Sequence, residues 1–438
     1  MRQFILYNTV RCEPFSWLLT RMKHVLIIVE NLPAPPDYRV WRIATTLRAA
    51  GWRVAVISPA TASWPAGEFE IEGIAVFRHW MPCEARRLAG YLVEYAVAVV
   101  QELRLSITVF RRARFQVIHA CNPPDLIWLV ALFWRLFGVK FVYDHHDLCP
   151  ELVLAKAGVQ SPADLGLVHR VLFRLMLAME RVSHWLADVV LATNESYQAV
   201  ALGRNRCVPE RVFTVKTAPT EAELAEGAAR TGAVEIADRG TVPQSGIEGG
   251  AALRIGYVGV MARQDGVDGL LRIARRLRTD LKKEFELVLV GDGPERAALG
   301  KMATELGLEP VTRFCGFLPR AAMMAEAQAF AIGVTPDPPG PMNNASTMLK
   351  VVDYMACGVA QVMYDLPENR ATAQDAAVYA TAGDEEAFAA ALAGLLDDGA
   401  AREALAARGR ARVRTLAWER NGAVALGNAY GALGLQRR

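Results

Sequence analysis

Short apolar runs alternate with helix-spaced segments along this chain, and that alternation restricts the fold more than any other feature. HVLIIV (24–29) is followed by a segment with apolar residues at helical spacing (40–50) and then by RVAVIS (53–58). Apolar runs without polar alternation are typical of strands buried on both faces, as in parallel sheets. Parallel strands need crossover connections, which are usually helices. The pattern therefore predicts βαβ units.

The same rhythm occurs twice. In the first half, further strands are expected at 116–120, 140–144 and 188–194, with helices over 124–138 and 165–187. The second half starts afresh at RIGYVG (254–259), with later strands at 286–291, 311–316, 330–335 and 359–365 and helices over 266–279 and 346–357. A chain of 438 residues exceeds the roughly 250–300 residues that one core usually supports. We expect an α/β fold of two Rossmann-like, doubly wound parallel-sheet domains.

Composition places the domain boundaries. Residues 221–252 are rich in Gly and Ala and poor in large apolar side chains, so they are expected to be a linker between domains at 23–220 and 253–416. A C-terminal helix is expected over 417–438. Residues 1–22 are interpreted as an extension or an upstream start, because MKHVLIIVE from Met22 is the more natural beginning.

Charge, cysteines and hydropathy exclude several classes. A net charge of +3 gives no footprint for nucleic acid. The 7 cysteines form no CxxC pair, which favours a reducing, cytoplasmic compartment. No apolar run is long enough for a spanning helix. Residues 86–114 combine arginines with apolar faces, so they either lie on anionic lipid or form an ordinary packed helix.

Ligands of open α/β sheets bind at the carboxyl ends of the strands, so the loops there carry the functional hypotheses. The first loop, ENLPAPPDYR (30–39), lacks the glycine fingerprint of nicotinamide enzymes. Its Asp37 and Arg39 face a ligand, or Asp37 caps the next helix. In CNPPD (121–125), Asn122 likewise caps a helix or contacts a ligand.

The loop DHHDLCPEL (144–152) concentrates ionisable side chains at a strand end. Histidine exchanges protons near neutral pH, and neighbouring carboxylates orient it. Metal binding is an alternative, but adjacent His145 and His146 point in different directions, and the sequence shows no further ligand cluster. A third reading is a polar loop in which Asp147 caps a helix.

Two loops of the second half suit a nucleotide. GVMARQDG (259–266) is an ordinary turn, or it binds a phosphate through backbone N–H groups and Arg263. In PPGPMNNASTMLKVVDYMACG (338–358), Lys350 and Asp353 are three residues apart and share a helix face. They form a solvated pair, or Lys350 neutralises a phosphate while Asp353 accepts a hydrogen bond from a ribose hydroxyl.

Seven motifs in order carry a resemblance to a known family: VLIIVENLPAPPDYRV, IHACNPPDLIWL, YDHHDLCPEL, ATNESY, GYVGVMARQDGVDGLL, VGDGPERAAL, and STMLKVVDYMACG followed by DLPENR. From about residue 23 to its end, the chain resembles glycosyltransferase family 4, retaining sugar-nucleotide transferases of the GT-B fold. It is most similar to the bacterial subgroup that builds surface polysaccharide or O-antigen.

The resemblance implies two domains that face each other across a cleft, with the C-terminal helix crossing back onto the first domain. It implies a nucleotide diphosphate-sugar as co-substrate in the second domain, an acceptor on the first, and no required metal or other cofactor. His146 and Asp147 then lie near the transferred sugar, and Lys350 and Arg263 complete the catalytic set. Asp37, Arg39, Asn122 and Glu151 belong to the acceptor side. The implied donor-binding residues are Gly259, Val260, Gln264, Asn344, Ser346, Thr347, Asp353 and Glu368.

The chain departs from the family pattern at several of these positions. Many members have two glutamates seven residues apart, which fall here on Ala345 and Asp353. Many also have an Arg and a Lys where this chain has Val260 and Asp265. We therefore expect Arg263 and Lys350, with Arg39 reaching across, to stabilise the leaving diphosphate.

The sequence thus predicts a retaining transferase that moves a sugar to a lipid-linked or growing glycan acceptor. It is expected to work in the cytoplasm at the inner face of the membrane. Front-face attack is expected, with His146 orienting groups rather than acting as the base. A sugar-nucleotide epimerase, a catalytically silent partner subunit and a dehydrogenase remain alternatives.

Overall fold

The computed structural model describes residues 23–81, 88–233 and 252–435. The chain forms two compact units. The first comprises the described residues within Met1–Pro150, Val171–Val215 and Ala423–Arg438, and the second those within Glu151–Arg170 and Lys216–Gly422. The expected extension at residues 1–22 lies outside the described residues.

The first unit is built on an eight-stranded sheet in the order β3-β4-β2-β1-β5-β6-β7-β8. Its strands are β1 (His24–Ile28), β2 (Arg53–Pro59), β3 (Gly67–Ile71), β4 (Ile74–His79), β5 (Val117–Cys121), β6 (Lys140–His145), β7 (Val189–Ala192) and β8 (Val212–Thr214). Every neighbouring pair is parallel except β3 with β4. Strands β1, β5 and β6 therefore point their carboxyl ends to the same edge, where the loops singled out above begin.

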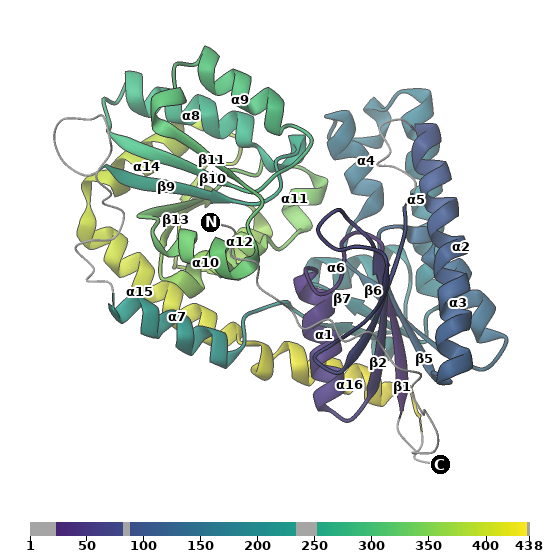
Figure 1. Ribbon diagram of the computed structural model, residues 1–438. Coiled ribbons are helices and arrows are strands. Elements are labelled where there is room, and N and C mark those ends of the chain that lie inside the picture. The colour runs from purple at the N-terminus through teal and green to yellow at the C-terminus, as the bar shows by residue number, and fades with distance from the viewer. Residues whose placement is uncertain (1–22, 82–87, 234–251, 436–438) are drawn as a thin grey trace. The chain divides into compact units, whose positions relative to one another are not determined.

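Helices cover both faces of this sheet. They are α1 (Tyr38–Ala49), α2 (Leu88–Arg112), α3 (Trp128–Arg135), α6 (Glu195–Ala199) and α16 (Gly422–Ala432), with most of α5 (Leu167–Leu186) and the first residues of α4 (Cys149–Ala157). In Figure 1, α2 and α3 lie on one face, and α1 and α16 lie on the other. Helix α1 begins because the Asp37 side chain accepts the Val40 N–H at 3.0 Å, and it ends before Gly51 at φ +84°.

The second unit holds a six-stranded parallel sheet in the order β11-β10-β9-β12-β13-β14. The strands are β9 (Leu253–Val258), β10 (Phe285–Val290), β11 (Thr312–Gly316), β12 (Ile332–Thr335), β13 (Ala360–Tyr364) and β14 (Val378–Ala380). Gly256 in β9 has a packing role, because a Cβ there would lie 2.0 Å from the Phe330 ring. The glycine thus lets a large aromatic side chain close the core against the strand.

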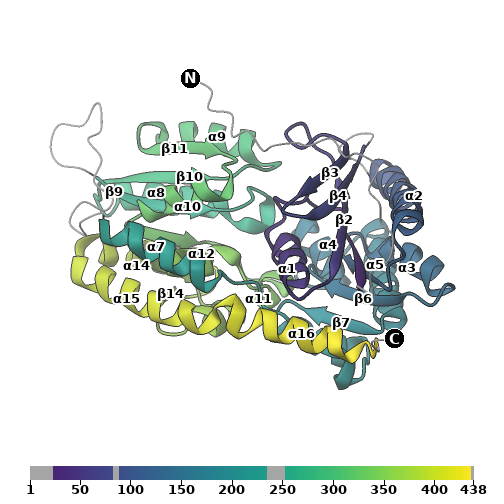
Figure 2. The same cartoon turned by 60° about the horizontal axis from the view of Figure 1, so that its bottom comes forward.

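Helices again cover both faces. They are α7 (Glu221–Ala233), α8 (Val267–Thr279), α9 (Arg296–Glu305), α10 (Arg320–Gln328), α11 (Pro341–Ala345), α12 (Leu349–Cys357), α13 (Pro367–Ala373), α14 (Glu385–Asp397) and α15 (Gly399–Leu416). Helices α8, α9 and α14 build the larger core with one face of the sheet, while α10 and α12 pack on the other. Figure 2 shows α7 and α15 alongside α12.

The expected linker was wrong in its first part. Residues 221–233 form helix α7, and its Leu224 packs against the cluster around α12. A capping box starts the helix: Thr220 N–H donates to Glu223 Oε2 at 2.7 Å, and Glu223 N–H donates to Thr220 Oγ1 at 3.1 Å. The Thr-x-x-Glu spacing signalled a helix that the Gly/Ala composition obscured. Residues 234–251 lie outside the described residues.

The units also differ from the expected domains at other boundaries. Residues 151–170, placed by sequence in the first domain, group with the second unit, and so do residues 216–220. The segment expected to be one helix over 417–438 contains a short 3₁₀ turn (Trp418–Arg420) and then α16. The described residues 423–435 belong to the first unit.

Helix α2 covers most of the segment for which lipid contact was considered, and the side chains of residues 82–94 lie outside the described part. Among the described residues, no helix is both long and apolar enough to cross a membrane.

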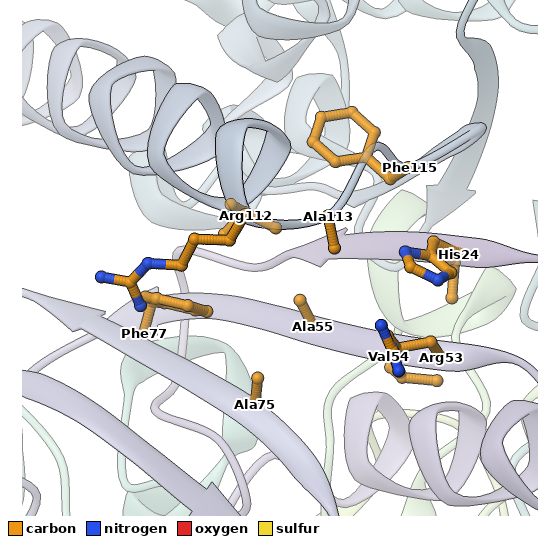
Figure 3. A pocket seen from close by; sticks show the side chains of 11 residues that line it. His24, Arg53, Val54, Ala55, Ala75, Phe77, Arg112, Ala113 and Phe115 are labelled. Carbon is orange, nitrogen blue, oxygen red and sulfur yellow. The ribbon is translucent and has the colours of Figure 1, made fainter. Parts of the chain in front are cut away.

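A mostly apolar pocket lies at the amino edge of the first sheet, away from the loops of interest. His24 and Arg53 at the strand starts, Phe77 on β4, and Arg112 and Phe115 at the end of α2 help to line it (Figure 3). Burial, aided by Arg53, lowers the pKa of His24 to about 4. Because open α/β sheets bind ligands at the opposite, carboxyl edge, this pocket is not the candidate site.

Candidate functional site

Asp144, at the end of β6, is the centre of a buried polar cluster in the first unit. Its carboxylate accepts from Arg39 Nη2 at 2.6 Å and Nε at 3.1 Å, and from His119 Nε2 at 3.2 Å and His146 Nε2 at 2.9 Å. The side chain is 0% exposed. Burial alone would raise the pKa of Asp144, but Arg39 and the two histidines hold it well below its ordinary value. The structure therefore keeps a negative charge directly behind the His146 ring.

His146 is fixed at both its backbone and its ring. Asn122 Oδ1 accepts the His146 N–H at 2.6 Å, and Asn122 Nδ2 donates to Asp147 O at 2.7 Å. Because an ionised carboxylate can only accept, His146 Nε2 carries the hydrogen that points at Asp144. The reading of Asn122 as a helix cap was wrong: Pro124 precedes the short turn Asp125–Ile127, with no side-chain cap.

The other members of the cluster are held from distant parts of the sequence. Arg39 Nη1 donates to Val215 O at 2.5 Å. His119 Nδ1 lies 2.9 Å from Tyr430 Oη on α16. Burial lowers the pKa of His119, so its neutral ring donates from Nε2 to Asp144 and accepts at Nδ1 from the tyrosine hydroxyl. Asp37 is buried beside this group as the cap of α1, and burial raises its pKa.

A second cluster lies at the carboxyl edge of the second unit's sheet. Lys350, in the first turn of α12, donates from Nζ to both carboxylate oxygens of Asp337, at 2.9 and 2.8 Å. The Nζ also lies 4.7 Å from the centre of the Tyr257 ring. Both members of the ion pair are buried, at 7% and 1% exposed. The solvated-pair reading of Lys350 with Asp353 was therefore wrong, because both side chains are buried and each is paired with a different residue.

Glycines shape the loops above this lysine. Gly259 follows β9 at φ +157°, and a Cβ there would lie 2.7 Å from Tyr257 Oη and 3.5 Å from Lys350 Cε. Gly291 follows β10 at φ +132°, and a Cβ there would lie 1.8 Å from Gly259 O. These positions thus require glycine, and they bring the backbone of two βα loops close to the lysine.

Asp265 adds a titratable group to the second cluster. Its Oδ2 accepts the Ala262 N–H at 3.2 Å. Burial raises the pKa of Asp265 to about 6, with Lys350 opposing the rise and Asp337 adding to it.

Asp265→Asn is expected to stabilise the protein at pH 7.5 and to have little effect at pH 4. When the pKa of an acidic side chain is higher in the folded state than in the unfolded state, the protein loses stability as the pH rises between the two pKa values. For Asp265 these are near 4 in the unfolded state and near 6 in the folded state. The asparagine, which can still accept from Ala262, removes that loss, worth up to about 3 kcal/mol at 1.36 kcal/mol per pKa unit. Urea unfolding of both proteins at the two pH values measures it. An equal difference at both pH values would contradict the expectation.

The remaining second-unit residues singled out in the sequence contact one another or nearby backbone. Ser346 Oγ donates to Met342 O at 2.8 Å, and Thr347 Oγ1 to Glu368 Oε2 at 3.2 Å. Asn344 N–H donates to Gly340 O at 2.9 Å. Asp353, which the resemblance assigns to the donor ribose, accepts a hydrogen bond from Arg320 Nη2 at 2.8 Å.

The loop after β9 carries three further residues that the sequence assigned to the site. Val260 is 56% exposed, and its carbonyl accepts from Tyr257 Oη at 2.6 Å. The Gln264 carbonyl accepts from Asn343 Nδ2 at 2.9 Å. Arg263 is exposed, and its guanidinium lies beside Gly158, where a Cβ would be 3.1 Å from Nη2.

The sequence assigned Glu151 to the acceptor side. This residue lies in the first turn of α4, and residues 151–170 group with the second unit. Asp147 is half-buried in the same loop as His146.

Sequence reasoning missed several members of both clusters. Asp144 is the first residue of the loop 144–152, which the sequence had already singled out, so its position at a strand end could have marked it as a site residue. His119 was hidden inside the apolar run QVIHA, and Tyr430 gave no local signal. Asp337 directly follows β12 in the sequence TPDPPG, where a polar strand end could have marked it.

The residues His119, Cys121 and Asp144 lie close enough to ligate a metal ion. They do not suit one. Asp144 already accepts four hydrogen bonds, and burial raises the pKa of the Cys121 thiol well above its ordinary value, so the thiolate ligand is disfavoured.

Both halves of the chain match models of known families. Residues 36–218 match the glycosyl transferase 4-like domain, and residues 252–398 match the glycosyl transferases group 1. The lipopolysaccharide core biosynthesis glycosyltransferase LpsD of Rhizobium meliloti is 31% identical over 161 residues, which cover 36% of this chain and 43% of that protein. The 2-deoxystreptamine glucosyltransferase of Streptomyces kanamyceticus is 27% identical over 302 residues, covering 68% of this chain and 74% of that protein.

Solved structures share the architecture. Sucrose-phosphate synthase from Thermosynechococcus elongatus superposes with a TM-score of 0.72 at 19% identity, covering 94% of this chain and 99% of that one. WaaG, a glycosyltransferase involved in lipopolysaccharide biosynthesis, superposes with a TM-score of 0.64 at 16% identity, covering 93% and 100%. The expected fold class, two doubly wound parallel-sheet domains of GT-B type, is thereby confirmed.

Proposed function

Because both halves of the chain match glycosyltransferase models and the fold is of GT-B type, we propose that the protein is a retaining, family 4 hexosyltransferase. It moves a sugar from a nucleotide diphosphate-sugar to a lipid-linked or growing glycan acceptor during surface-polysaccharide biosynthesis. This takes place in the cytoplasm, at the inner face of the membrane. The match to a lipopolysaccharide-core enzyme supports this acceptor class.

The observation that carries the donor half of the proposal is the buried Lys350 below two glycine loops. Gly259 and Gly291 let the backbones of the two loops pack closely together at this edge, and Lys350 supplies the positive charge. An ammonium has three donors, so Lys350 can keep one bond to Asp337 while it binds a phosphate oxygen. Structures of the same fold carry donors of this class: HepE of Anabaena is in complex with UDP and glucose, and a trehalose-6-phosphate enzyme of E. coli is bound with UDP-2-fluoro glucose.

The Asp144 cluster of the first unit supports the part of the proposal that concerns the acceptor. With Nε2 directed at Asp144, the His146 ring leaves Nδ1 for a hydrogen bond with a sugar hydroxyl. Asp144 stabilises the protonated ring whenever charge develops nearby. His146 therefore orients the acceptor or the transferred sugar and need not remove a proton.

In the proposed mechanism the acceptor oxygen attacks the anomeric carbon on the face from which the diphosphate leaves. The bond from that carbon to the phosphate oxygen breaks as the new glycosidic bond forms, and the departing phosphate oxygen takes the acceptor proton. Negative charge grows on the diphosphate, where one well-placed donor contributes roughly 3–4 kcal/mol. Lys350 is the donor we assign to this role.

His146→Ala is expected to lower kcat about 10²–10³-fold with the fold retained, because the ring orients reacting groups without supporting the core. A thermal-shift panel of nucleotide-sugars first identifies the donor, and single-turnover transfer from that donor then gives the rate. His169→Ala is the matched control, since His169 is exposed on α5. Equal rates in both variants would refute the role of His146.

The same experiments test the function itself. An epimer formed from the donor alone, without acceptor, would identify an epimerase. If neither UDP nor GDP bound in calorimetric titration, a silent partner subunit would be the better description.

A further inference from the structure

Three ionisable side chains that the proposed reaction does not use meet in the first unit. Glu30 follows β1, His79 ends β4, and Glu102 lies in α2. One ligand atom from each lies within 4.8 Å of the others, and His79 Nε2 is 3.0 Å from Glu30 Oε2. The group thus joins two strand ends and a helix at the carboxyl edge of the sheet.

All three side chains are buried, and most of their polar atoms lack well-aligned hydrogen-bond partners in the part of the chain that the structure describes. Glu102 is 0% exposed, and the side chains of His79 and Glu30 are 1% and 6% exposed. Among the described residues, neither oxygen of either glutamate, nor His79 Nε2, has a well-aligned hydrogen-bond partner. The 3.0 Å contact has the length of a hydrogen bond without its alignment. Buried polar groups are rarely left in this state.

The cluster also lacks a compensating cation among the described residues. The neighbouring Arg78 is committed elsewhere: its guanidinium donates to Ala34 O at 3.1 and 2.9 Å and lies over the rings of Trp64 and Phe69. Two adjacent buried carboxylates repel each other strongly. Among the described residues, the cluster is therefore one that a bound cation would stabilise.

The contact between His79 and Glu30 has a length that suits two ligands of one ion. Two ligand atoms that each lie about 2.1 Å from one metal ion, with a ligand–metal–ligand angle of about 90–109°, are about 3.0–3.4 Å from each other. The distance between His79 Nε2 and Glu30 Oε2 falls in this range. The two carboxylates offer four oxygens, so bidentate binding fills the coordination that three residues would otherwise leave open. His79 Nδ1 lies 3.5 Å from Trp80 O, an arrangement that directs the Nε2 lone pair toward the glutamates.

We propose that Glu30, His79 and Glu102 form a binding site for one divalent first-row transition-metal ion, for which Zn²⁺ is the probe. Imidazole and carboxylate ligands suit such ions. The ion would tie the start of loop 30–37 to β4 and α2. That loop leads to Asp37 and Arg39, so the ion would secure the approach to the Asp144 cluster without taking part in transfer.

The test uses the full chain after chelator treatment, with metal content measured by mass spectrometry. The wild type is expected to take up one equivalent of Co²⁺ with a d–d absorption band and no thiolate charge-transfer band. Zn²⁺ at a hundred times its dissociation constant is expected to raise Tm by about 5 °C. Glu102→Gln, which keeps the side-chain shape, should lose that equivalent and the response to Zn²⁺.

Cys121→Ala is the control, because it disables the other possible ligand group and should retain the equivalent. Equal metal uptake by the wild type and Glu102→Gln would overturn the proposal, as would a wild-type Tm that Zn²⁺ leaves unchanged. A metal-insensitive Tm that falls with rising pH would show that protons hold the cluster together. The wild-type Co²⁺ spectrum decides the matter even if Glu102→Gln does not fold.

Discussion

Replacing Asp144 by alanine is expected to lower the free energy of unfolding by about 3–5 kcal/mol, the cost of breaking a buried ion pair from one side. The change leaves the Arg39 guanidinium buried, and it removes the acceptor of His119 and His146 together. Transfer should fall at least as far as in His146→Ala, because the ring loses its orientation. Urea unfolding and single-turnover rates measure the two effects.

Glu68→Ala is the matched control for this loss. Glu68 pairs with Arg112 in the same unit, but both side chains are substantially exposed, at 40% and 44%. Exposed pairs contribute about 0–1 kcal/mol. If Asp144→Ala cost no more than Glu68→Ala, burial of the Asp144 cluster would not have the energetic role described here.

Lys350→Met is expected to lower the free energy of unfolding by a similar amount, about 3–5 kcal/mol, and to abolish transfer. Methionine fills much of the same space but leaves Asp337 buried without its cation. The affinity for UDP should fall as well, since Lys350 is the cation assigned to the diphosphate. Unfolding in urea and calorimetric titration with UDP test these effects separately.

A double variant separates the contribution of Lys350 to stability from its contribution to donor binding and transfer. Lys350→Met combined with Asp337→Asn removes the unpaired charge, so the double variant should regain most of the stability. It should regain neither UDP affinity nor transfer. Recovery of activity along with stability would mean that Lys350 only supports the fold, and that the diphosphate is bound elsewhere.

The alternation of strands and helices could be predicted from sequence because each element carries its own local pattern. The buried run at 24–29, the cap Asp37 and the terminal Gly51 together delimited the first βα unit. The same holds for the loops at strand ends, which parallel topology places at one edge. Local composition failed at residues 221–233, where few large side chains suffice for α7 because it packs on another helix.

The partners of the site residues could not be predicted, because they come from distant positions. Arg39 and Asp144 are separated by 105 residues, and His119 and Tyr430 by 311. No pattern within a short window encodes such contacts. The sequence identified His146 and Lys350 as residues whose chemistry suits a site. It did not show that the carboxylates of Asp144 and Asp337 pair with them.

The contact between His119 and Tyr430 has a consequence for how the protein is made. The first unit contains both the earliest described strand and residues 423–435. Domains generally fold during synthesis, beginning from the N-terminus. Here the leading portion leaves the ribosome without the tyrosine that completes its hydrogen-bond network. It must therefore wait, in a partly finished state, until translation has passed Tyr430.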